Sequence, residues 1–392
     1  MTDQIRNSIK HSARLDKLPP YLFDELDRAK QRLSAAGVEV IDLAIGDPDL
    51  PTPSRIVERM REAVGDVSHH RYPGYRGSAA LRQAIARWFA RRFGVSLDPE
   101  SEILVLIGSK EGLGHLPFAL LDAGDTVLVP DPGYPVYANT SVMAGGSVAY
   151  FSLREENEFL PDVAELGSLG DPKLVFLNYP NNPTGATATE RFFERVVDFA
   201  LSKGALLCND AAYSEITFGG FKSPSILSHP KAMECAIEVH SFSKTYNMTG
   251  WRIGFAAGNG EMLKALARVK VNLDSCVFGA IQEAAVTALS LDCADSLLVY
   301  DRRRELAFEW LSRMGCHFFA GKGAFYVWAR APLGLTSADF AVRLLEKAGV
   351  CVVPGSGFGQ NGEGWFRIAL TRPEAEIARG LQRMAELKLW TS

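Results

Sequence analysis

The chain has 392 residues, of which 47% are hydrophobic and 22% are charged, and its formal net charge at pH 7 is -4. This composition is typical of a soluble globular protein with two or three domains and a large core. The pI near 6.0 gives no support to binding of nucleic acid or of a membrane surface. The sequence also lacks the run of about 18 apolar residues that a membrane span needs, and its start lacks the apolar core of a signal peptide.

The cysteine pattern bears on the cellular compartment. Six cysteines are scattered along the chain with no CxxC pair, at Cys208, Cys235, Cys276, Cys293, Cys316 and Cys351. In a chain of this length, such cysteines are expected to be buried, reduced thiols. The sequence therefore predicts a cytoplasmic protein, and it predicts no metal site.

The first half of the chain predicts a large α/β domain. In chain order, apolar spacing predicts a helix at 20–36, a strand at 38–43, a loop at 46–53, a helix at 54–64, a second loop at 69–77 and a helix at 78–93. Strands are then expected at 103–107, 126–129, 147–151, 174–178, 206–208 and 236–240, and helices around 110–121, 134–144, 189–202 and 259–271. Because buried strands that alternate with helices form parallel sheets, residues 50–285 are expected to form this domain.

The remaining segments predict a small α+β domain. A helical region at 282–314 leads to strands at 317–319 and 324–329, a helix at 337–347, strands at 350–353 and 364–369, and a helix from residue 373. Residues 286–392 would form this domain, and residues 1–49 would supply an N-terminal arm and a further part of it.

The stretch SFSKTYNMTGWR, residues 241–252, places Lys244 directly after a predicted strand. Ligands bind at this end of the strands in open α/β sheets, and a lysine becomes nucleophilic where a dry or cationic pocket lowers its pKa. Ser241, Ser243 and Arg252 are suited to hold a phosphate beside it. The simpler interpretation, favoured for this stretch alone, is a solvated lysine in a turn.

Three further loops follow predicted strands and carry polar or aromatic side chains. Ser109 and Lys110 begin a helix, whose N-terminal N–H groups can bind an anion. Tyr134, on the next loop, can stack on a planar ring or pack in the core. Asn182 lies in the rigid turn NYPNNPTG, residues 178–185, which can aim an amide into a site or serve only as a turn.

Two charged residues at apolar strands need partners. Asp210 follows the strand at 206–208, where a buried acid is costly unless it pairs with a cation or a donor. A heterocyclic N–H⁺ is one such partner, and capping of the next turn is the alternative. Arg367 lies inside the apolar strand WFRIAL, and a buried guanidinium needs an anion such as a substrate carboxylate.

In this order, the motifs resemble those of the fold-type-I, pyridoxal-phosphate-dependent class I/II aminotransferases over residues 19–387. The similarity is closest to the LL-diaminopimelate aminotransferases. It rests on PPYLF at 19–23, IGSKEG at 107–112, PDPGYPVY at 130–137, NYPNNPTG at 178–185, DAAYSEI at 210–216 and YNMTGWR at 246–252. The resemblance implies a large domain with a mainly parallel seven-stranded sheet between two layers of helices, a small α+β domain, and a homodimer that shares its active sites.

The resemblance also implies roles for the site residues. Lys244 would carry pyridoxal 5′-phosphate as a Schiff base and move the proton between Cα and C4′, and Asp210 would keep the pyridine nitrogen protonated. Asn182 and Tyr213 would hydrogen-bond the ring oxygen O3′, and Tyr134 would stack on the ring. The phosphate ligands would be Ser109, Lys110, Ser241, Ser243, Arg252 and Tyr72 of the partner subunit, and the substrate ligands would be Arg367 at the α-carboxylate, Gly46 and Tyr21.

One motif departs from that of the diaminopimelate enzymes. Where they are expected to have Tyr-Pro-Thr-Ser-Glu-Gly, this chain has YPGYRG at 72–77. The expected acid could face the distal ammonium of diaminopimelate, whereas Arg76 would repel that ammonium and favour a distal carboxylate or phosphate. The alternative is that Arg76 points to solvent.

The expected activity is transfer of an amino group between an amino acid, such as LL-diaminopimelate, and a 2-oxo acid such as 2-oxoglutarate. The same cofactor can also support β- or γ-elimination, replacement or cyclisation, because a fold does not decide the outcome of a reaction. A third alternative, a non-catalytic cofactor-binding regulator, is disfavoured because every expected catalytic position is filled.

Overall fold

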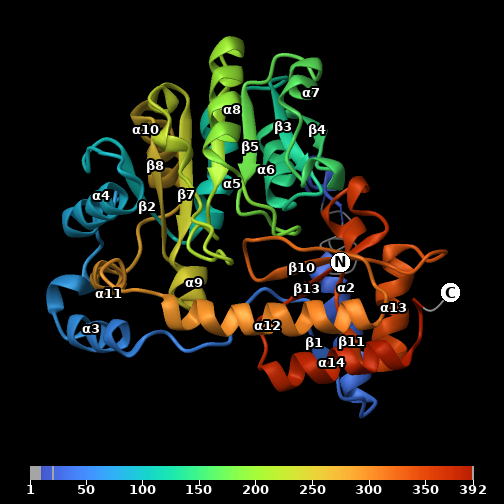
Figure 1. Ribbon diagram of the computed structural model, residues 1–392. Helices are drawn as coiled ribbons and strands as arrows, with labels where there is room; N and C mark the ends of the chain where they lie inside the picture. Colours follow the sequence, from blue (N-terminus) through green and yellow to red (C-terminus); the bar gives the residue numbers. More distant parts are fainter. Residues whose placement is uncertain (1–9, 20–21, 391–392) are drawn as a thin grey trace, which may run out of the picture.

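A seven-stranded sheet, in the order β2-β8-β7-β6-β5-β3-β4, forms the centre of the larger part of the molecule (Figure 1). The computed structural model describes residues 10–19 and 22–390. The strands are β2 (Ile103–Leu106), β3 (Thr126–Asp131), β4 (Ser147–Ser152), β5 (Leu174–Asn178), β6 (Leu206–Asp210), β7 (Ala236–Ser241) and β8 (Gly254–Gly258). All neighbours are parallel except the two pairs that β8 makes, with β2 and β7. The predicted, mainly parallel seven-stranded sheet is confirmed.

Helices cover both faces of this sheet. On one face lie α5 (Ser109–Leu120), α6 (Val136–Ala144) and α10 (Gly260–Leu273), and on the other lie α4 (Ala79–Phe93), α8 (Glu190–Lys203) and α11 (Gly279–Ala288). The side chains of β2 show why two layers form. Leu104 and Leu106 pack in the core beneath α5, α6 and α10, whereas Ile103 and Val105 point to the opposite face and pack in the core beneath α4, α8 and α11. The α/β/α arrangement follows from strands that are apolar on both faces.

Strand β8 was not predicted, because its sequence GFAAG has no β-branched residue and resembles a loop. The small residues are required by close backbone contacts. A Cβ at Gly254 would lie 2.6 Å from the carbonyl oxygen of His240, and one at Gly258 would lie 2.5 Å from that of Ala236. The close approach of neighbouring backbone to β8 therefore excludes the larger, β-branched side chains from which a strand is usually predicted.

The smaller part contains the N-terminal and C-terminal segments. β1 (Ile41–Asp42) pairs in parallel with β11 (Val350–Cys351), beside an antiparallel sheet in the order β12-β13-β10-β9. Its strands are β12 (Val353–Pro354), β13 (Trp365–Ala369), β10 (Tyr326–Arg330) and β9 (Phe318–Phe319), and its helices include α2 (Leu22–Ala35), α13 (Ser337–Ala348) and α14 (Glu374–Glu386). The predicted domain boundaries near residues 50 and 286 stay predictions.

The remaining helices are α3 (Ser54–Val64), α7 (Val163–Ser168), α9 (Phe242–Thr245) and α12 (Ala294–Arg313). The single helical region expected at 282–314 is in fact two helices, α11 and α12, and an Asp292 carboxylate caps the second by accepting from the N–H of Ala294. In Figure 1, α12 runs beneath the large sheet and α9, and reaches the small sheet.

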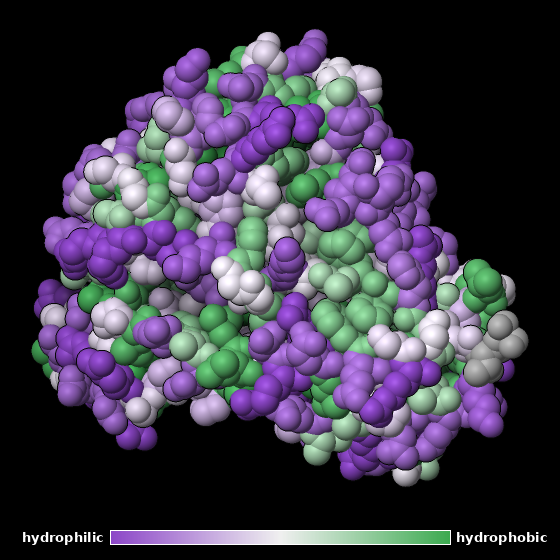
Figure 2. Space-filling model, in the orientation of Figure 1, coloured by the Kyte–Doolittle hydropathy of each residue, from purple (hydrophilic) through white to green (hydrophobic). Residues whose placement is uncertain are grey.

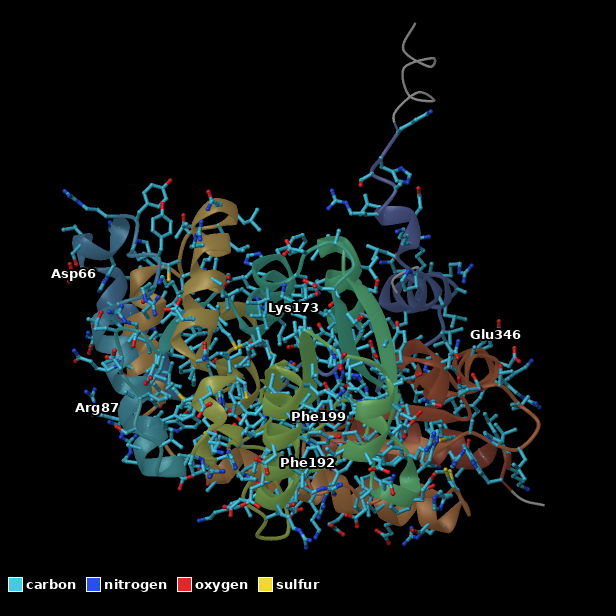
Figure 3. The ribbon with its side chains drawn as sticks, turned by 90° about the horizontal axis from the view of Figure 1, so that it is seen from above. Asp66, Arg87, Lys173, Phe192, Phe199 and Glu346 are labelled. Carbon is cyan, nitrogen blue, oxygen red and sulfur yellow. The ribbon has the colours of Figure 1, made fainter. Side chains whose placement is uncertain are left out.

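The two parts lie at opposite ends of the molecule. Seen from above, Asp66 and Arg87 lie at one end and Glu346 of α13 lies at the other, with Lys173 and Phe199 between them (Figure 3). On the face shown in Figure 2, hydrophilic residues predominate above and below, and hydrophobic residues gather at mid-height. Within the described residues, none of the helices combines the length and apolar character that crossing a bilayer requires.

Candidate active site

The carboxyl ends of the central strands bring the predicted loops to one edge of the large sheet. Asn178 and Asp210 end β5 and β6 and are paired in register, and Ser241 at the end of β7 is paired with Gly254. A cavity of about 430 Å³ opens at this edge, between the large sheet and strands β10 and β13. The predicted residues that line it are Gly46, Ser109, Lys110, Tyr134, Asn182, Asp210, Tyr213, Ser241, Ser243, Lys244, Arg252 and Arg367.

Lys244 lies on α9, a single turn that begins where β7 ends. Its Nζ donates a hydrogen bond of 2.8 Å to the carbonyl oxygen of Gly46. Burial lowers the pKa of Lys244 to about 8, with the positive charges of Arg367 and Arg252 adding to this effect and Asp47 opposing it. A substantial fraction of the amine is therefore unprotonated, and hence nucleophilic, in neutral to mildly alkaline solution.

This lowered pKa predicts the pH dependence of labelling at Lys244. With a small aldehyde and borohydride, the rate of labelling should rise about tenfold per pH unit up to pH 8 and then level off, because only the neutral amine reacts. A lysine with the ordinary pKa of about 10.5 would keep gaining reactivity up to pH 10. Peptide mass spectrometry at several pH values measures both, with exposed Lys222 as the internal comparison. A continuous rise at Lys244 would contradict the prediction.

Asp210 is buried at the end of β6, facing the cavity. Its Oδ2 accepts a hydrogen bond of 2.8 Å from the hydroxyl of Tyr137, and its Oδ1 accepts from the N–H of Ala212. Burial raises the pKa of Asp210 to about 6, although the hydrogen bond from Tyr137 lowers it. Both donors to Asp210 are neutral, so its negative charge is not compensated by them and can pair with a cation in the cavity.

Tyr213 and Tyr326 form a hydroxyl pair at the wall of the cavity. Their hydroxyl oxygens are 2.8 Å apart, and burial raises the pKa of Tyr213 well above its ordinary value. Tyr326 also lies close to the loop that carries Gly46, because a Cβ at Gly46 would be 2.0 Å from the Tyr326 hydroxyl. The Tyr213 phenol therefore remains protonated, and the proton that is not used between the two hydroxyls can be donated into the cavity.

A cradle for an anion lies beside Lys244. Ser109 is the first residue of α5, whose first-turn N–H groups and dipole attract negative charge. The guanidinium of Arg252 lies against this helix start, because a Cβ at Gly108 would be 2.5 Å from its Nη2. Ser243 and Ser241 add hydroxyl groups, and Ser241 Oγ caps α9 by accepting from the N–H of Ser243.

Arg367 projects from β13 and is only 2% exposed. Its Nη1 donates to Asn182 Oδ1 and its Nη2 to the carbonyl oxygen of Ala44, both at 2.6 Å, while its buried Nε has no hydrogen-bond partner. The guanidinium lies 4.2 Å from the ring centre of Tyr326 and 4.9 Å from that of Phe358. These hydrogen bonds go to neutral oxygens, so the site can gain a carboxylate partner.

Two of the predicted residues that the structure describes, Tyr72 and Arg76, do not line this cavity. Tyr72 is 93% exposed. Arg76 Nη2 donates to the carbonyl oxygens of Ser101 and Ile103, at the end of β2 opposite to the cavity. Within one subunit this placement separates Arg76 from the cavity, because backbone carbonyls hold its guanidinium. Tyr21 lies outside the described residues.

Several residues of the site were not singled out from the sequence. Tyr137 does not line the cavity itself but donates a hydrogen bond to Asp210, which does. It lies on α6, three residues after Tyr134 in the same motif, and this spacing could have indicated it. Asp47 and Asn178 also belong to motifs already noted. No sequence pattern indicated Tyr326, because it lies in an apolar strand whose residues are expected to pack in the core.

The comparisons with known proteins agree with this geometry. Residues 38–384 match the family described as aminotransferase class I and II. The chain is 48% identical over 379 residues to an LL-diaminopimelate aminotransferase of Syntrophobacter fumaroxidans, covering 95% of this chain and 98% of the relative, and 49% identical over 382 residues to one of Desulforudis audaxviator, covering 96% and 97%.

A solved structure resembles the whole chain. The substrate-bound BacF structure from Bacillus subtilis superposes with a TM-score of 0.94 and 36% sequence identity, over 98% of this chain and 99% of that one. The family match covers most of the sequence, including every residue of the Lys244 stretch. This chain belongs to the class I and II aminotransferases.

Proposed function

We propose that the cavity binds pyridoxal 5′-phosphate and that the chain transfers the amino group of LL-diaminopimelate to a 2-oxo acid such as 2-oxoglutarate. The observation that carries the proposal is one cavity in which Lys244, with a lowered pKa, lies between the buried acid Asp210 and an anion cradle. The choice of donor is supported by the relatives named LL-diaminopimelate aminotransferase.

The residues at the cavity fit this cofactor. Asp210, whose two hydrogen-bond donors are neutral, would hold the protonated ring nitrogen. Asn182 and Tyr213 would hold the ring oxygen O3′, and Tyr134 would lie on the ring face. The phosphate would be held by Ser109, Lys110, Ser241, Ser243 and Arg252, which combine helix N–H groups, hydroxyl groups and positive charge.

The chain's own residues would then bind and orient the reactants. When bound, pyridoxal phosphate supplies an aldehyde that condenses with amines and a ring that withdraws electrons from the substrate Cα. Lys244 Nζ would take the proton from Cα, since its pKa near 8 suits a base in neutral solution. Arg367 would hold the α-carboxylate and so fix Cα relative to Lys244.

A donor and acceptor screen tests the reaction. The purified enzyme should convert LL-diaminopimelate to a keto product only when a 2-oxo acid is present, and it should form glutamate from 2-oxoglutarate in equal amount. Product release without any acceptor would instead indicate elimination. Failure to use LL-diaminopimelate while another amino acid is converted would overturn the choice of donor but leave the transamination intact.

Arg76 is expected to support the fold rather than choose the substrate. Replacing it by Ala should lower the free energy of unfolding by about 1–3 kcal/mol, because hydrogen bonds from a charged donor to two carbonyls are lost. The KM for LL-diaminopimelate should change less than about threefold. Denaturant unfolding and steady-state kinetics measure the two effects, and a large change in KM with unchanged stability would restore a role in recognition.

A homodimer is part of the same proposal. Exposed apolar side chains lie on and just after η2 (Val67–His70), which packs against α11: Val67 is 74% exposed and Tyr72 93%. A second copy could cover them and let Tyr72 of the partner subunit approach the anion cradle. Light scattering should give twice the chain mass of 42.8 kDa.

The six free cysteines fit the predicted cytoplasmic location.

A further inference from the structure

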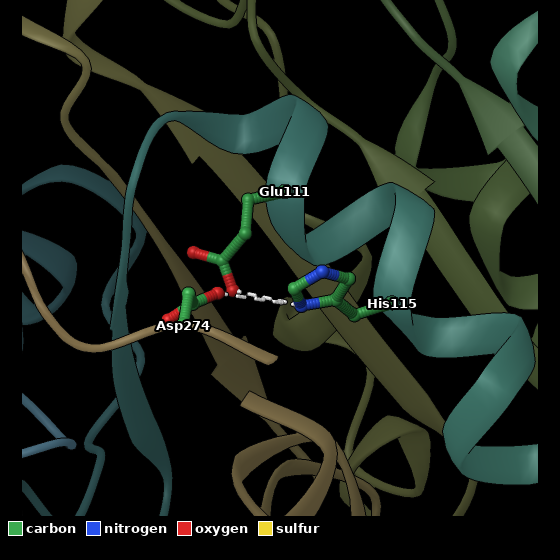
Figure 4. A group of neighbouring side chains, drawn as sticks. All are labelled: Glu111, His115 and Asp274. Carbon is green, nitrogen blue, oxygen red and sulfur yellow. Dashed lines mark ion pairs between the residues drawn. The ribbon is translucent and has the colours of Figure 1, made fainter. Parts of the chain in front are cut away.

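A group of charged side chains outside the cavity joins α5 to the end of α10. Glu111 and His115 lie one turn apart on α5, and Asp274 follows the last turn of α10 (Figure 4). The side chain of Lys270 is 0% exposed, and its Nζ donates to Glu111 Oε2 at 3.0 Å and to Asp274 Oδ1 at 2.7 Å. One oxygen of each carboxylate is therefore fixed by the same ammonium group.

The other oxygen of each carboxylate faces the imidazole. Glu111 Oε1, Asp274 Oδ2 and His115 Nδ1 are all buried without a hydrogen-bond partner. His115 Nδ1 lies 3.2 Å from Glu111 Oε1 and 3.7 Å from Asp274 Oδ2. These distances exceed the roughly 2.7–2.9 Å of a charge-assisted hydrogen bond. The side chain of Glu111 is only 9% exposed, so solvent gives its oxygen little compensation.

These three atoms, which have no hydrogen-bond partner, have the spacing of metal ligands. They all lie within 4.8 Å of one another. Nitrogen and oxygen ligands at about 2.0–2.2 Å from a tetrahedral zinc ion are themselves separated by about 3.3–3.6 Å. The two distances from His115 lie on either side of this range. Lys270 then plays the part of an outer partner that orients ligating carboxylates.

The charge of the group also leaves room for a cation. With a neutral imidazole, two carboxylates and one ammonium leave one negative charge in a largely buried place.

We propose that Glu111 Oε1, His115 Nδ1 and Asp274 Oδ2 bind a divalent transition-metal ion of the zinc type, with water completing the tetrahedron. The ion would join the first turn of α5, beside the anion cradle, to the end of α10. The sequence predicted no metal site, because Asp274 is distant from the other two ligands along the chain and no short motif unites them.

Metal binding to the purified holoenzyme tests the proposal. After dialysis against a chelator, the protein should take up one zinc ion per chain in competition with a chromophoric chelator, and elemental analysis should confirm the ratio. Cobalt(II) in place of zinc should give the visible absorption of a tetrahedral site. His115→Ala and Asp274→Asn should each lose this binding, by at least about 100-fold for the removal of a ligand.

Two further variants make the test decisive. His115→Gln keeps a side chain of similar size and should fold as the wild type does while losing the ion. His317→Ala is the matched control, since His317 pairs with Glu155 at 2.6 Å in a pair to which no third ligand belongs. It should bind zinc normally. No uptake by the wild type, or equal uptake by His115→Ala and Asp274→Asn, would overturn the site.

Discussion

Replacement of Lys244 by Ala should lower the rate of amino transfer by about 10⁴-fold or more. The variant lacks both the amine that can attach to a carbonyl and the base beside the substrate Cα. Both losses follow from the position of Lys244 at the carboxyl edge of the sheet, where its Nζ contacts the loop of Gly46. Formation of glutamate from 2-oxoglutarate measures the rate.

The matched control is Lys222→Ala, which removes an exposed lysine of a surface loop. It should keep the wild-type rate. The Lys244→Ala protein should also lack the change in absorbance that the wild type shows on binding pyridoxal phosphate, since the Nζ proposed to attach to the cofactor is absent. Turnover within tenfold of the wild type would refute the role of Lys244.

Asp210→Asn should lower the same rate by about 10²–10⁴-fold. The amide has the shape of the carboxylate and can still accept from Tyr137, but it carries no negative charge to hold a protonated ring nitrogen. Steady-state kinetics should show the loss mainly in kcat. Tyr137→Phe is the comparison, because it removes one hydrogen bond and keeps the charge, so its effect should be tenfold or less.

Asp210 should also make the stability of the cofactor-free protein depend on pH. Its pKa is about 6 in the folded chain and about 3.8 when unfolded, so the unfolded chain releases the proton first. The resulting stabilisation is present below pH 4 and is lost as the pH rises through 6, by up to about 3 kcal/mol. Denaturant unfolding at pH 4 and 7 should show a difference between wild type and Asp210→Asn. Parallel curves would contradict it.

Much of the architecture could be predicted because its signals are local. The strands that end at Asn178 and Asp210 place apolar residues in both cores, the strand that ends at Ser241 alternates between apolar and polar residues, and each leads into a polar loop. In a parallel sheet these loops must meet at one edge, so a list of loop residues becomes a candidate site before any coordinate is known. The same reasoning missed β8. Its glycines are required by the close approach of neighbouring backbone and follow no hydrophobic pattern.

The residues that could not be predicted depend on contacts between distant segments. The sequence predicts that Tyr326 packs in the core, since it lies in an apolar strand. Only the folded chain brings its hydroxyl to that of Tyr213. Arg76 stands in a motif that suggests recognition, yet its guanidinium is bound by carbonyls at the start of β2. In both cases the direction of a side chain, rather than its type or spacing, decides what it does.

The hydrogen bond from Arg367 to the carbonyl of Ala44 spans 323 positions of the chain. Contacts of such long range form late, because a long loop must be closed before they can stabilise anything. During synthesis, Ala44 is made well before Arg367. The segments that carry Lys244 and Asp210 can therefore fold before the carboxylate clamp exists. A ribosome-bound chain that stops short of β13 would have the groups proposed to bind the cofactor but would lack the guanidinium proposed to hold the amino acid.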